Sequence, residues 1–211
     1  MSAQRKRCLK LLSNTEADVI LVTNDNLRKY AKYDPIHEAY EYLSETHRAD
    51  YLRTYFMHFL GGGYCDIKSP GKSWSKAFEE VENNLDIYCV GYREIDYGSV
   101  EPDVPQIVRD NWMKILGNGA YIFKANTEFT SEWYLSCKKL LDNSINQLKK
   151  FPATHPRQTY CAIHGVAGKM DGYEYPFRWG QLLSEIFHPI CYKHRNKISQ
   201  VLPRPILTDY R

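Results

Sequence analysis

The chain has 211 residues, of which 43% are hydrophobic, so it is long enough to fold around a substantial core. Its formal net charge is +3, and its basic residues are spread along the sequence except for the short cluster Arg5, Lys6 and Arg7. This distribution argues against a nucleic-acid partner. No apolar run approaches the roughly 20 residues that a helix needs to cross a bilayer, so no membrane span is expected.

The six cysteines stand at wide and irregular intervals and form no C-x-x-C pair that could begin a zinc site. We interpret them as reduced, mostly buried thiols of a soluble cytoplasmic protein. The sequence has no internal repeat, low-complexity segment or linker, so residues 1–211 are predicted to form a single domain.

The first third of the chain predicts helices around one strand. Residues 2–13 have helical apolar spacing, and "ADVILVT" (17–23) is a continuous apolar run typical of a buried strand that ends in the turn 24–26. Helix is predicted again from Pro35, with a break near Ser44. The apolar residues expected on the core face of the following helix are Leu52, Tyr55, Phe56, Phe59 and Leu60.

Three glycines, 61–63, are predicted to end this helix, and "YCDIK" (64–68) follows as a short strand. Further strands are predicted at 86–92 and 119–125, and an amphipathic helix at 131–151. Strands that alternate with helices predict an α/β domain with a central, mostly parallel mixed sheet of about six strands flanked by helices. Ligands of such folds bind at the carboxyl ends of the strands.

Two pairs of charged residues are candidates for chemistry. Asp50 and Arg53 are three residues apart on the predicted helix and point away from its apolar face, which fits either a solvated ion pair or part of a binding site. In the strand that follows, Tyr64, Asp66 and Lys68 alternate to one face. Asp66 could form a salt bridge there, or it could hold a divalent metal that binds a diphosphate.

The array Asp50-x-x-Arg53, seven residues, Gly61-Gly62-x-Tyr64-x-Asp66 resembles the "S-D-x-x-R … G-G-x-Y-x-D-x-D" sugar-binding region of GT-A-fold glycosyltransferases. It is similar to the capsular-polysaccharide-synthesis and Och1-like groups, and more distantly to the clostridial glucosylating toxins. It also resembles glycosyltransferase domains that chloroviruses encode to build capsid glycans, which would act in the host cytoplasm.

The resemblance implies roles for individual residues. Asp50 and Arg53 would contact the donor sugar and its phosphates, Gly62 and Gly63 would let the backbone approach, and Asp66 would be the first acid of the D-x-D site. One departure is that Lys68 stands at the second acid position. A protonated lysine does not ligate a metal, so either fewer protein groups hold the ion or Lys68 neutralises the phosphate charge directly.

The remaining site residues are predicted from both ends of the chain. A late histidine loop in the resembling enzymes implies that His164 ligates the metal and that Lys169 contacts the β-phosphate. A carboxylate and an imidazole together suit Mn²⁺ better than Ca²⁺, so Mn²⁺ is the expected cofactor, with Mg²⁺ as the alternative. Thr23, at the end of the first predicted strand, could meet the base or ribose, although its sequence is more typical of turn formation.

The predicted function is therefore a metal-dependent glycosyltransferase. It would move a hexose or deoxyhexose from a nucleotide diphosphate sugar, a UDP-sugar first, to a hydroxyl of a glycan or glycoprotein acceptor, and the resembling families imply retention of configuration. Asp50 and Asp66 would be its catalytic residues. Two alternatives stay open, namely a nucleotide-sugar hydrolase or pyrophosphatase, and a non-catalytic glycan- or nucleotide-binding module.

Overall fold

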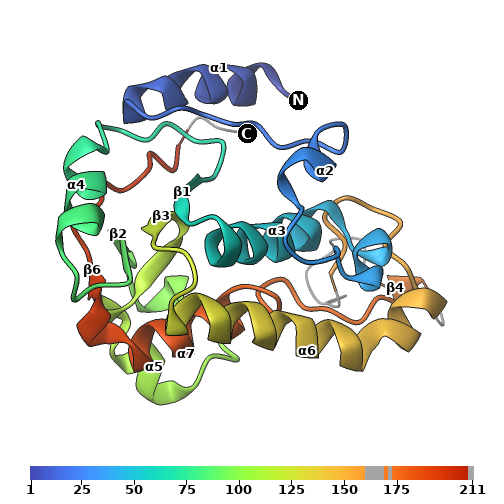
Figure 1. The fold of residues 1–211 in the computed structure, drawn as a ribbon. Coiled ribbons are helices and arrows are strands. Elements are labelled where there is room, and N and C mark those ends of the chain that lie inside the picture. The colour runs from blue at the N-terminus through green and yellow to red at the C-terminus, as the bar shows by residue number, and fades with distance from the viewer. Residues whose placement is uncertain (160–168, 171–172, 209–211) are drawn as a thin grey trace.

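A four-stranded sheet forms the centre of the protein in a computed structural model, which describes residues 1–159, 169–170 and 173–208 (Figure 1). The strand order is β1-β3-β2-β6. The strands are β1 (Gly62–Cys65), β2 (Cys89–Arg93), β3 (Leu116–Phe123) and β6 (Ile198–Ser199). Strand β3 runs antiparallel to both β1 and β2, while β2 and β6 are parallel.

The prediction of a mixed α/β fold is confirmed, but the predicted sheet of about six mostly parallel strands is wrong. Two of the three strand pairings are antiparallel, and β4 (Lys169–Met170) and β5 (Tyr173–Glu174) form a separate two-stranded sheet. The unit β1-α4-β2 does keep its two strands in one direction. However, β3 is inserted between them in the opposite direction, which the order of elements along the sequence does not determine.

Seven α-helices and five short 3₁₀ helices occur in the described residues. The α-helices are α1 (Ala3–Leu11), α2 (Leu27–Tyr30), α3 (Glu45–Phe59), α4 (Ser75–Asn83), α5 (Gln106–Asp110), α6 (Glu128–Lys150) and α7 (Ser184–Lys193). The 3₁₀ helices are η1 (Leu12–Thr15), η2 (Glu38–Tyr42), η3 (Tyr97–Ser99), η4 (Trp112–Lys114) and η6 (Arg195–Lys197). Within this part of the chain, none of the helices combines the length and the apolar character that crossing a membrane requires.

The two faces of β3 are covered by different helices. Tyr121 and Phe123 belong to the larger core cluster, which is built with α3, α6 and α7, whereas Ala120 and Ile122 pack in a smaller cluster with α4. In Figure 1, α4 lies on one side of the strands, and α6 and α7 lie on the other. Because alternate residues of a strand point to opposite faces, one strand supplies both clusters.

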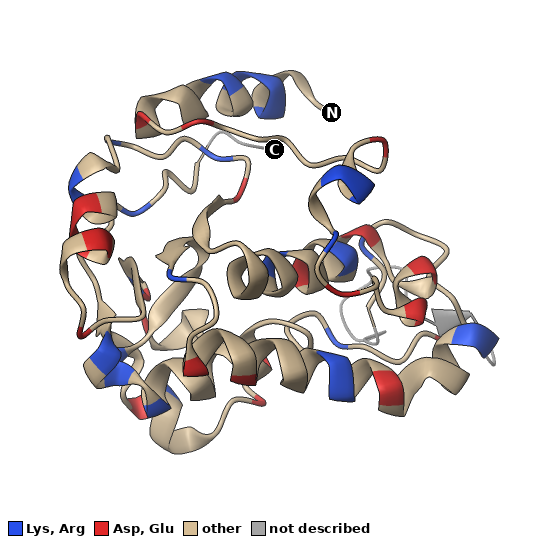
Figure 2. Cartoon of the chain, in the orientation of Figure 1, with Lys and Arg blue, Asp and Glu red and all other residues tan. Residues whose placement is uncertain are grey.

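Charged residues of both signs are distributed over most of these elements. Figure 2 shows Lys and Arg on helices at every side of the molecule, with Asp and Glu among them, rather than a single basic stripe.

The segment 17–23, predicted as a buried strand, is instead irregular and exposed. Val19, Ile20 and Leu21 are 45%, 57% and 39% exposed, and no strand of the described sheet pairs with this segment. A run of apolar, β-branched residues forms a strand only when a neighbouring strand supplies hydrogen bonds and packing. The turn predicted after it, at 24–26, is confirmed.

Helix α3 begins and ends where the sequence predicts. Ser44 caps it, since its hydroxyl oxygen accepts a hydrogen bond from the His47 N–H. At its end, Gly61 and Gly62 have φ angles of +65° and +78°, the left-handed region that glycine reaches without steric cost. The predicted core face is only partly correct, because Tyr55 is fully buried whereas Leu60 is 44% exposed.

The five described cysteines are all free thiols. Cys8, Cys89, Cys137 and Cys191 are buried, and Cys65 is half-buried. The prediction of reduced, mostly buried cysteines is thus confirmed for these five, and Cys161 lies outside the described residues.

Candidate functional site

Four charged side chains meet where α3 passes the carboxyl end of β1. The guanidinium nitrogen Arg53 Nη2 lies 3.0 Å from Asp50 Oδ1 and 3.9 Å from Asp66 Oδ1. On the other side of Asp66, Lys68 Nζ lies 2.8 Å from Oδ2. We call Asp50, Arg53, Asp66 and Lys68 the charged cluster. The two predicted pairs therefore form one group, with Arg53 between the two carboxylates.

The interpretation of Asp50 and Arg53 as a solvated ion pair is wrong. Their side chains are only 2% and 8% exposed, because α3 packs against α6 and β1 and turns this face inward. Arg53 Nη1 also donates a hydrogen bond to the Asn118 carbonyl oxygen at 2.9 Å, and its guanidinium lies 4.4 Å from the centre of the Tyr64 ring. A buried arginine with several fixed partners is a preorganised cation.

Asp66 is held by its backbone and by both carboxylate oxygens. Its N–H donates to the Gly119 carbonyl at 2.8 Å, which extends the β1–β3 pairing by one residue. The Tyr64 hydroxyl donates to Oδ1 at 2.7 Å and Lys68 Nζ donates to Oδ2 at 2.8 Å. The prediction that these three side chains lie together is thus confirmed. The predicted strand 64–68 is wrong in its bounds, because β1 ends at Cys65 and Lys68 lies in a bend.

The two carboxyl groups of the cluster differ in their acidity. Burial raises the pKa of Asp50 to about 7, against the lowering effect of the Arg53 charge. Burial also raises the pKa of Asp66, but Arg53, Lys68 and the hydrogen bonds from Lys68 and Tyr64 outweigh it, so that its pKa falls below the ordinary value. Asp66 is therefore an ionised, half-exposed acceptor, and Asp50 is a buried partner of Arg53.

The side chains of Asp66 and Lys68 are partly exposed, by 29% and 15%. The outer edge of β1 pairs with no strand in the described part of the chain. Opposite Asp66, a Cβ atom on Gly119 would lie 3.1 Å from the Tyr92 hydroxyl oxygen, 3.5 Å from Asp66 Oδ2 and 3.8 Å from Lys68 Nζ. Gly119 is buried, so the absence of a side chain there lets these groups pack closely against β3.

Sequence reasoning missed three residues of this site, Tyr92, Asn118 and Gly119. The Tyr92 hydroxyl accepts a hydrogen bond from the Gly119 N–H at 3.1 Å, and the Asn118 carbonyl accepts from Arg53. The sequence "LGNGAYIF" did carry a signal, because two glycines inside a strand indicate the close approach of another group. For Gly117 that group is the Tyr92 ring, which a Cβ atom would overlap.

Three buried polar atoms next to the cluster have no hydrogen-bond partner among the described residues. They are Arg53 Nε, Asn118 Oδ1 and the Tyr121 hydroxyl oxygen. Buried polar atoms are nearly always hydrogen-bonded to protein, water or a ligand. The inner wall of the site therefore has unused hydrogen-bonding capacity.

The other predicted site residues are not brought to the cluster by any described contact. Thr23 is exposed and belongs to a turn, in which its N–H donates to Asn26 Oδ1 at 2.7 Å and its carbonyl accepts from Leu27. The backbone of Lys169 pairs with Glu174 in the β4–β5 hairpin. The Lys169 side chain and the whole of His164 lie outside the described residues, so their predicted roles stay predictions.

The described part of the site does not form a Mn²⁺ or Mg²⁺ centre by itself. Within the described ranges, no three His, Cys, Asp or Glu side chains lie close enough together to hold a metal ion. Asp66 already accepts from Lys68 and faces Arg53, and a divalent cation would have to enter beside these two positive charges. The donor set thus fits an anion better than a cation.

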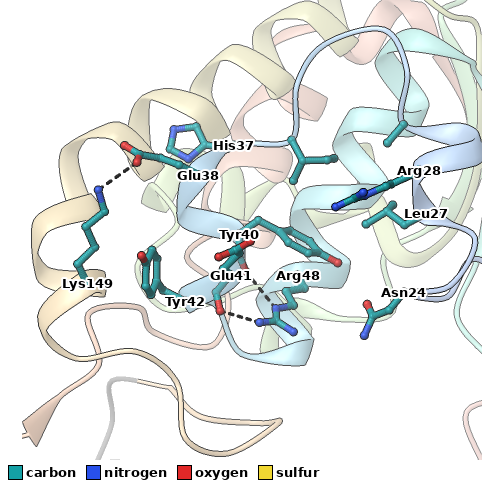
Figure 3. A pocket seen from close by; sticks show the side chains of 12 residues that line it. Asn24, Leu27, Arg28, His37, Glu38, Tyr40, Glu41, Tyr42, Arg48 and Lys149 are labelled. Carbon is teal, nitrogen blue, oxygen red and sulfur yellow. Dashed lines mark hydrogen bonds and ion pairs between the residues drawn. The ribbon is translucent and has the colours of Figure 1, made fainter.

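A separate pocket of about 580 Å³ lies between α2, η2, the start of α3 and the end of α6 (Figure 3). Arg48 forms part of its wall and donates hydrogen bonds to the Tyr40 and Glu41 carbonyls, while Lys149 is paired with Glu38 at 3.0 Å. None of the predicted site residues lines this pocket. This pocket and the charged cluster are therefore separate candidate sites.

The chain has no significant match among protein-family models, curated proteins or solved structures.

Proposed function

We propose that this protein is a glycosyltransferase that takes a hexose or deoxyhexose from a nucleotide diphosphate sugar, with a UDP-sugar as the first candidate donor. The observation that carries the proposal is the charged cluster, in which residues 16 positions apart in the sequence meet at the carboxyl end of β1. Three of these residues, Asp50, Arg53 and Asp66, stand at the positions of the spacing pattern that resembles the donor site of GT-A glycosyltransferases.

In this proposal the cations of the cluster bind the diphosphate of the donor. When the bond between the anomeric carbon and the phosphate oxygen breaks, negative charge develops on the departing nucleoside diphosphate, and fixed positive groups stabilise it. The acceptor hydroxyl oxygen forms the new bond to the anomeric carbon, and its proton passes to the departing phosphate. Retention of configuration follows from the resemblance.

The two carboxylates have different roles in the proposal. Asp66 is 29% exposed and can accept hydrogen bonds from a sugar or ribose hydroxyl. Asp50 is only 2% exposed, so its role is to position Arg53 rather than to contact the sugar. Holding the donor in one orientation lowers the entropic part of the barrier.

The test is calorimetric titration of UDP, GDP and CMP into the protein and into Asp66→Asn. We expect one nucleotide to bind the native chain and to bind the variant at least about tenfold more weakly, which corresponds to about 1.4 kcal/mol. Asp86→Asn is the matched control, because the Asp86 side chain is 94% exposed and lies outside the cluster. If none of the nucleotides binds the folded protein, the proposal is wrong.

One observation favours a second function, a non-catalytic nucleotide-binding module. Asp66 is held in an ion pair with Lys68, where the resembling enzymes carry a second acid. A glycosyltransferase consumes its nucleotide sugar, whereas a binding module leaves it intact. We expect the protein, incubated with the matching nucleotide sugar and hydroxylated acceptors, to release nucleoside diphosphate at a rate that increases with acceptor concentration. An intact donor after long incubation would favour the binding module, and a release rate that ignores acceptor would indicate a hydrolase.

A further inference from the structure

The contacts of Asp66 indicate whether a metal ion or a protein cation neutralises a diphosphate at this site. Both oxygens of the Asp66 carboxylate are engaged, Oδ1 by the Tyr64 hydroxyl at 2.7 Å and Oδ2 by Lys68 Nζ at 2.8 Å. A metal ion bound to Asp66 would have to share the carboxylate with the ammonium group of Lys68. Two cations on one carboxylate repel each other, and this repulsion is strong in a partly buried site.

The charge balance of the cluster also argues against a bound divalent cation. Even with both carboxylates ionised, Arg53 and Lys68 balance them, so the cluster has no surplus negative charge to attract a divalent cation. A nucleoside diphosphate, in contrast, brings at least two negative charges. It can draw Lys68 partly away from Asp66 and accept hydrogen bonds from an ammonium that is already in place.

Lys68 is the more exposed of the two cations in the cluster. Its side chain is 15% exposed, whereas that of Arg53 is 8% exposed. Arg53 adds a second, immobile positive charge deeper in the site, with its Nε atom still without a hydrogen-bond partner among the described residues. One accessible cation and one fixed cation together suit a ligand with two phosphates.

We infer that Lys68, backed by Arg53, neutralises the donor diphosphate directly and that nucleotide binding at this site does not require a divalent metal. The inference rests on the proposed function, since it concerns the same donor site. In this inference the Lys68 side chain takes the role that was predicted for a Mn²⁺ ion bound to Asp66 and His164.

The test is titration of UDP, or of whichever nucleotide the first screen identifies, in EDTA and again in added Mn²⁺. We expect the native protein to bind with the same Kd, within about twofold, in both buffers. Lys68→Met removes the charge and should weaken binding about tenfold or more in either buffer, while Lys68→Arg should retain most of the affinity. Lys76→Met, an exposed lysine of α4, is the matched control.

The decisive variant is Lys68→Asp, which creates the second acid of a D-x-D site. We expect this variant to bind nucleotide poorly in EDTA and to regain affinity when Mn²⁺ is added. Circular dichroism of each variant verifies the fold. If the native protein binds only with Mn²⁺, or if Lys68→Met leaves Kd unchanged, the inference is wrong although the proposed function stands. If no nucleotide binds in either buffer, both fail together.

Discussion

Arg53 donates a hydrogen bond to the carbonyl oxygen of Asn118 at 2.9 Å and thereby joins the middle of α3 to β3, 65 residues further along the chain. The same guanidinium is 3.0 Å from Asp50 Oδ1, and both side chains are buried. The arginine is thus part of the packing between helix and sheet as well as part of the candidate site. Its replacement should affect the stability of the fold before any effect on a ligand is considered.

We expect Arg53→Met to lower the free energy of unfolding by about 3–5 kcal/mol, because it leaves the Asp50 carboxylate buried without its partner. Urea denaturation followed by tryptophan fluorescence measures this change. Arg28→Met, at an exposed position of α2, is the control and should change stability by less than about 0.5 kcal/mol. The double variant Arg53→Met with Asp50→Leu should recover part of the loss, and equal stability of single and double variants would contradict this explanation.

The raised pKa of Asp50 predicts that stability depends on pH. Its carboxyl has a pKa of about 7 in the folded protein and 3.8 when unperturbed, so between these values the folded state holds a proton that the unfolded state has lost. The Asp50 contribution to stability should therefore fall as pH rises from about 4 to about 7. Each pKa unit corresponds to about 1.4 kcal/mol, so the loss is on the order of a few kcal/mol.

Asp50→Asn cannot lose a proton and should lack this decline. Denaturation of the native chain and of Asp50→Asn at a series of pH values measures the difference between their free energies of unfolding. We expect this difference to shift in favour of the variant by pH 8. A difference that stays constant from pH 4 to pH 8 would contradict a raised pKa at Asp50.

His47 predicts a pH dependence of the opposite sign. The ring is fully buried, its Nδ1 accepts from the Tyr175 hydroxyl at 2.8 Å, and its Nε2–H donates to the Arg178 carbonyl at 3.0 Å. Burial lowers the pKa of His47 from 6.5 to about 4, so the unfolded state binds the extra proton in that range. Stability from His47 is present above pH 6.5 and is lost as pH falls toward 4.

His47→Gln should be less stable than the native chain at pH 7 by about 1–3 kcal/mol, because the two ring hydrogen bonds are lost. The gap should narrow as pH falls to 4, since the variant has no proton to gain. Thermal unfolding at pH 7 and pH 4.5 tests this, and a gap that widens at acid pH would show that the ring is protonated in the folded protein.

The glycines after α3 differ in what they tolerate. At Gly61, which has φ +65°, an added Cβ would lie 2.7 Å from the Phe123 carbonyl oxygen, whereas at Gly62, with φ +78°, no atom lies within 4 Å. We expect Gly61→Ala to cost about 2–4 kcal/mol, from conformational strain plus the clash with β3, and Gly62→Ala to cost about 1–2 kcal/mol from strain alone. Chemical denaturation measures both, and equal costs would show that the clash relaxes.

Local signals predicted several elements of this fold correctly. The start of α3 at Ser44 is determined by capping, and its end at the glycines after Leu60 is determined by backbone conformation. Both effects act within a few residues. The direction of β3 and the exposure of Val19, Ile20 and Leu21 depend instead on which strands become neighbours. No window of sequence contains that information.

For the candidate site as well, local sequence predicted some features, whereas those set by tertiary packing were missed. The spacing of Asp50, Arg53 and Asp66 identified the residues that meet, but it did not reveal that the first two are buried, because burial is imposed by α6 and β1 packing against α3. Gly119 was missed because it is small where Tyr92, Asp66 and Lys68 approach β3, and these residues are 27 to 53 positions away in the sequence.

The buried thiols can be used to detect transient opening of the structure. Cys89, Cys137 and Cys191 lie on β2, α6 and α7, each with no exposed surface and with a pKa that burial raises. An alkylating reagent in water reaches these sulfur atoms only while the surrounding elements are transiently separated. The masses of the labelled peptides after brief alkylation would therefore show whether the strand and the two helices detach together or one at a time, without an engineered cysteine.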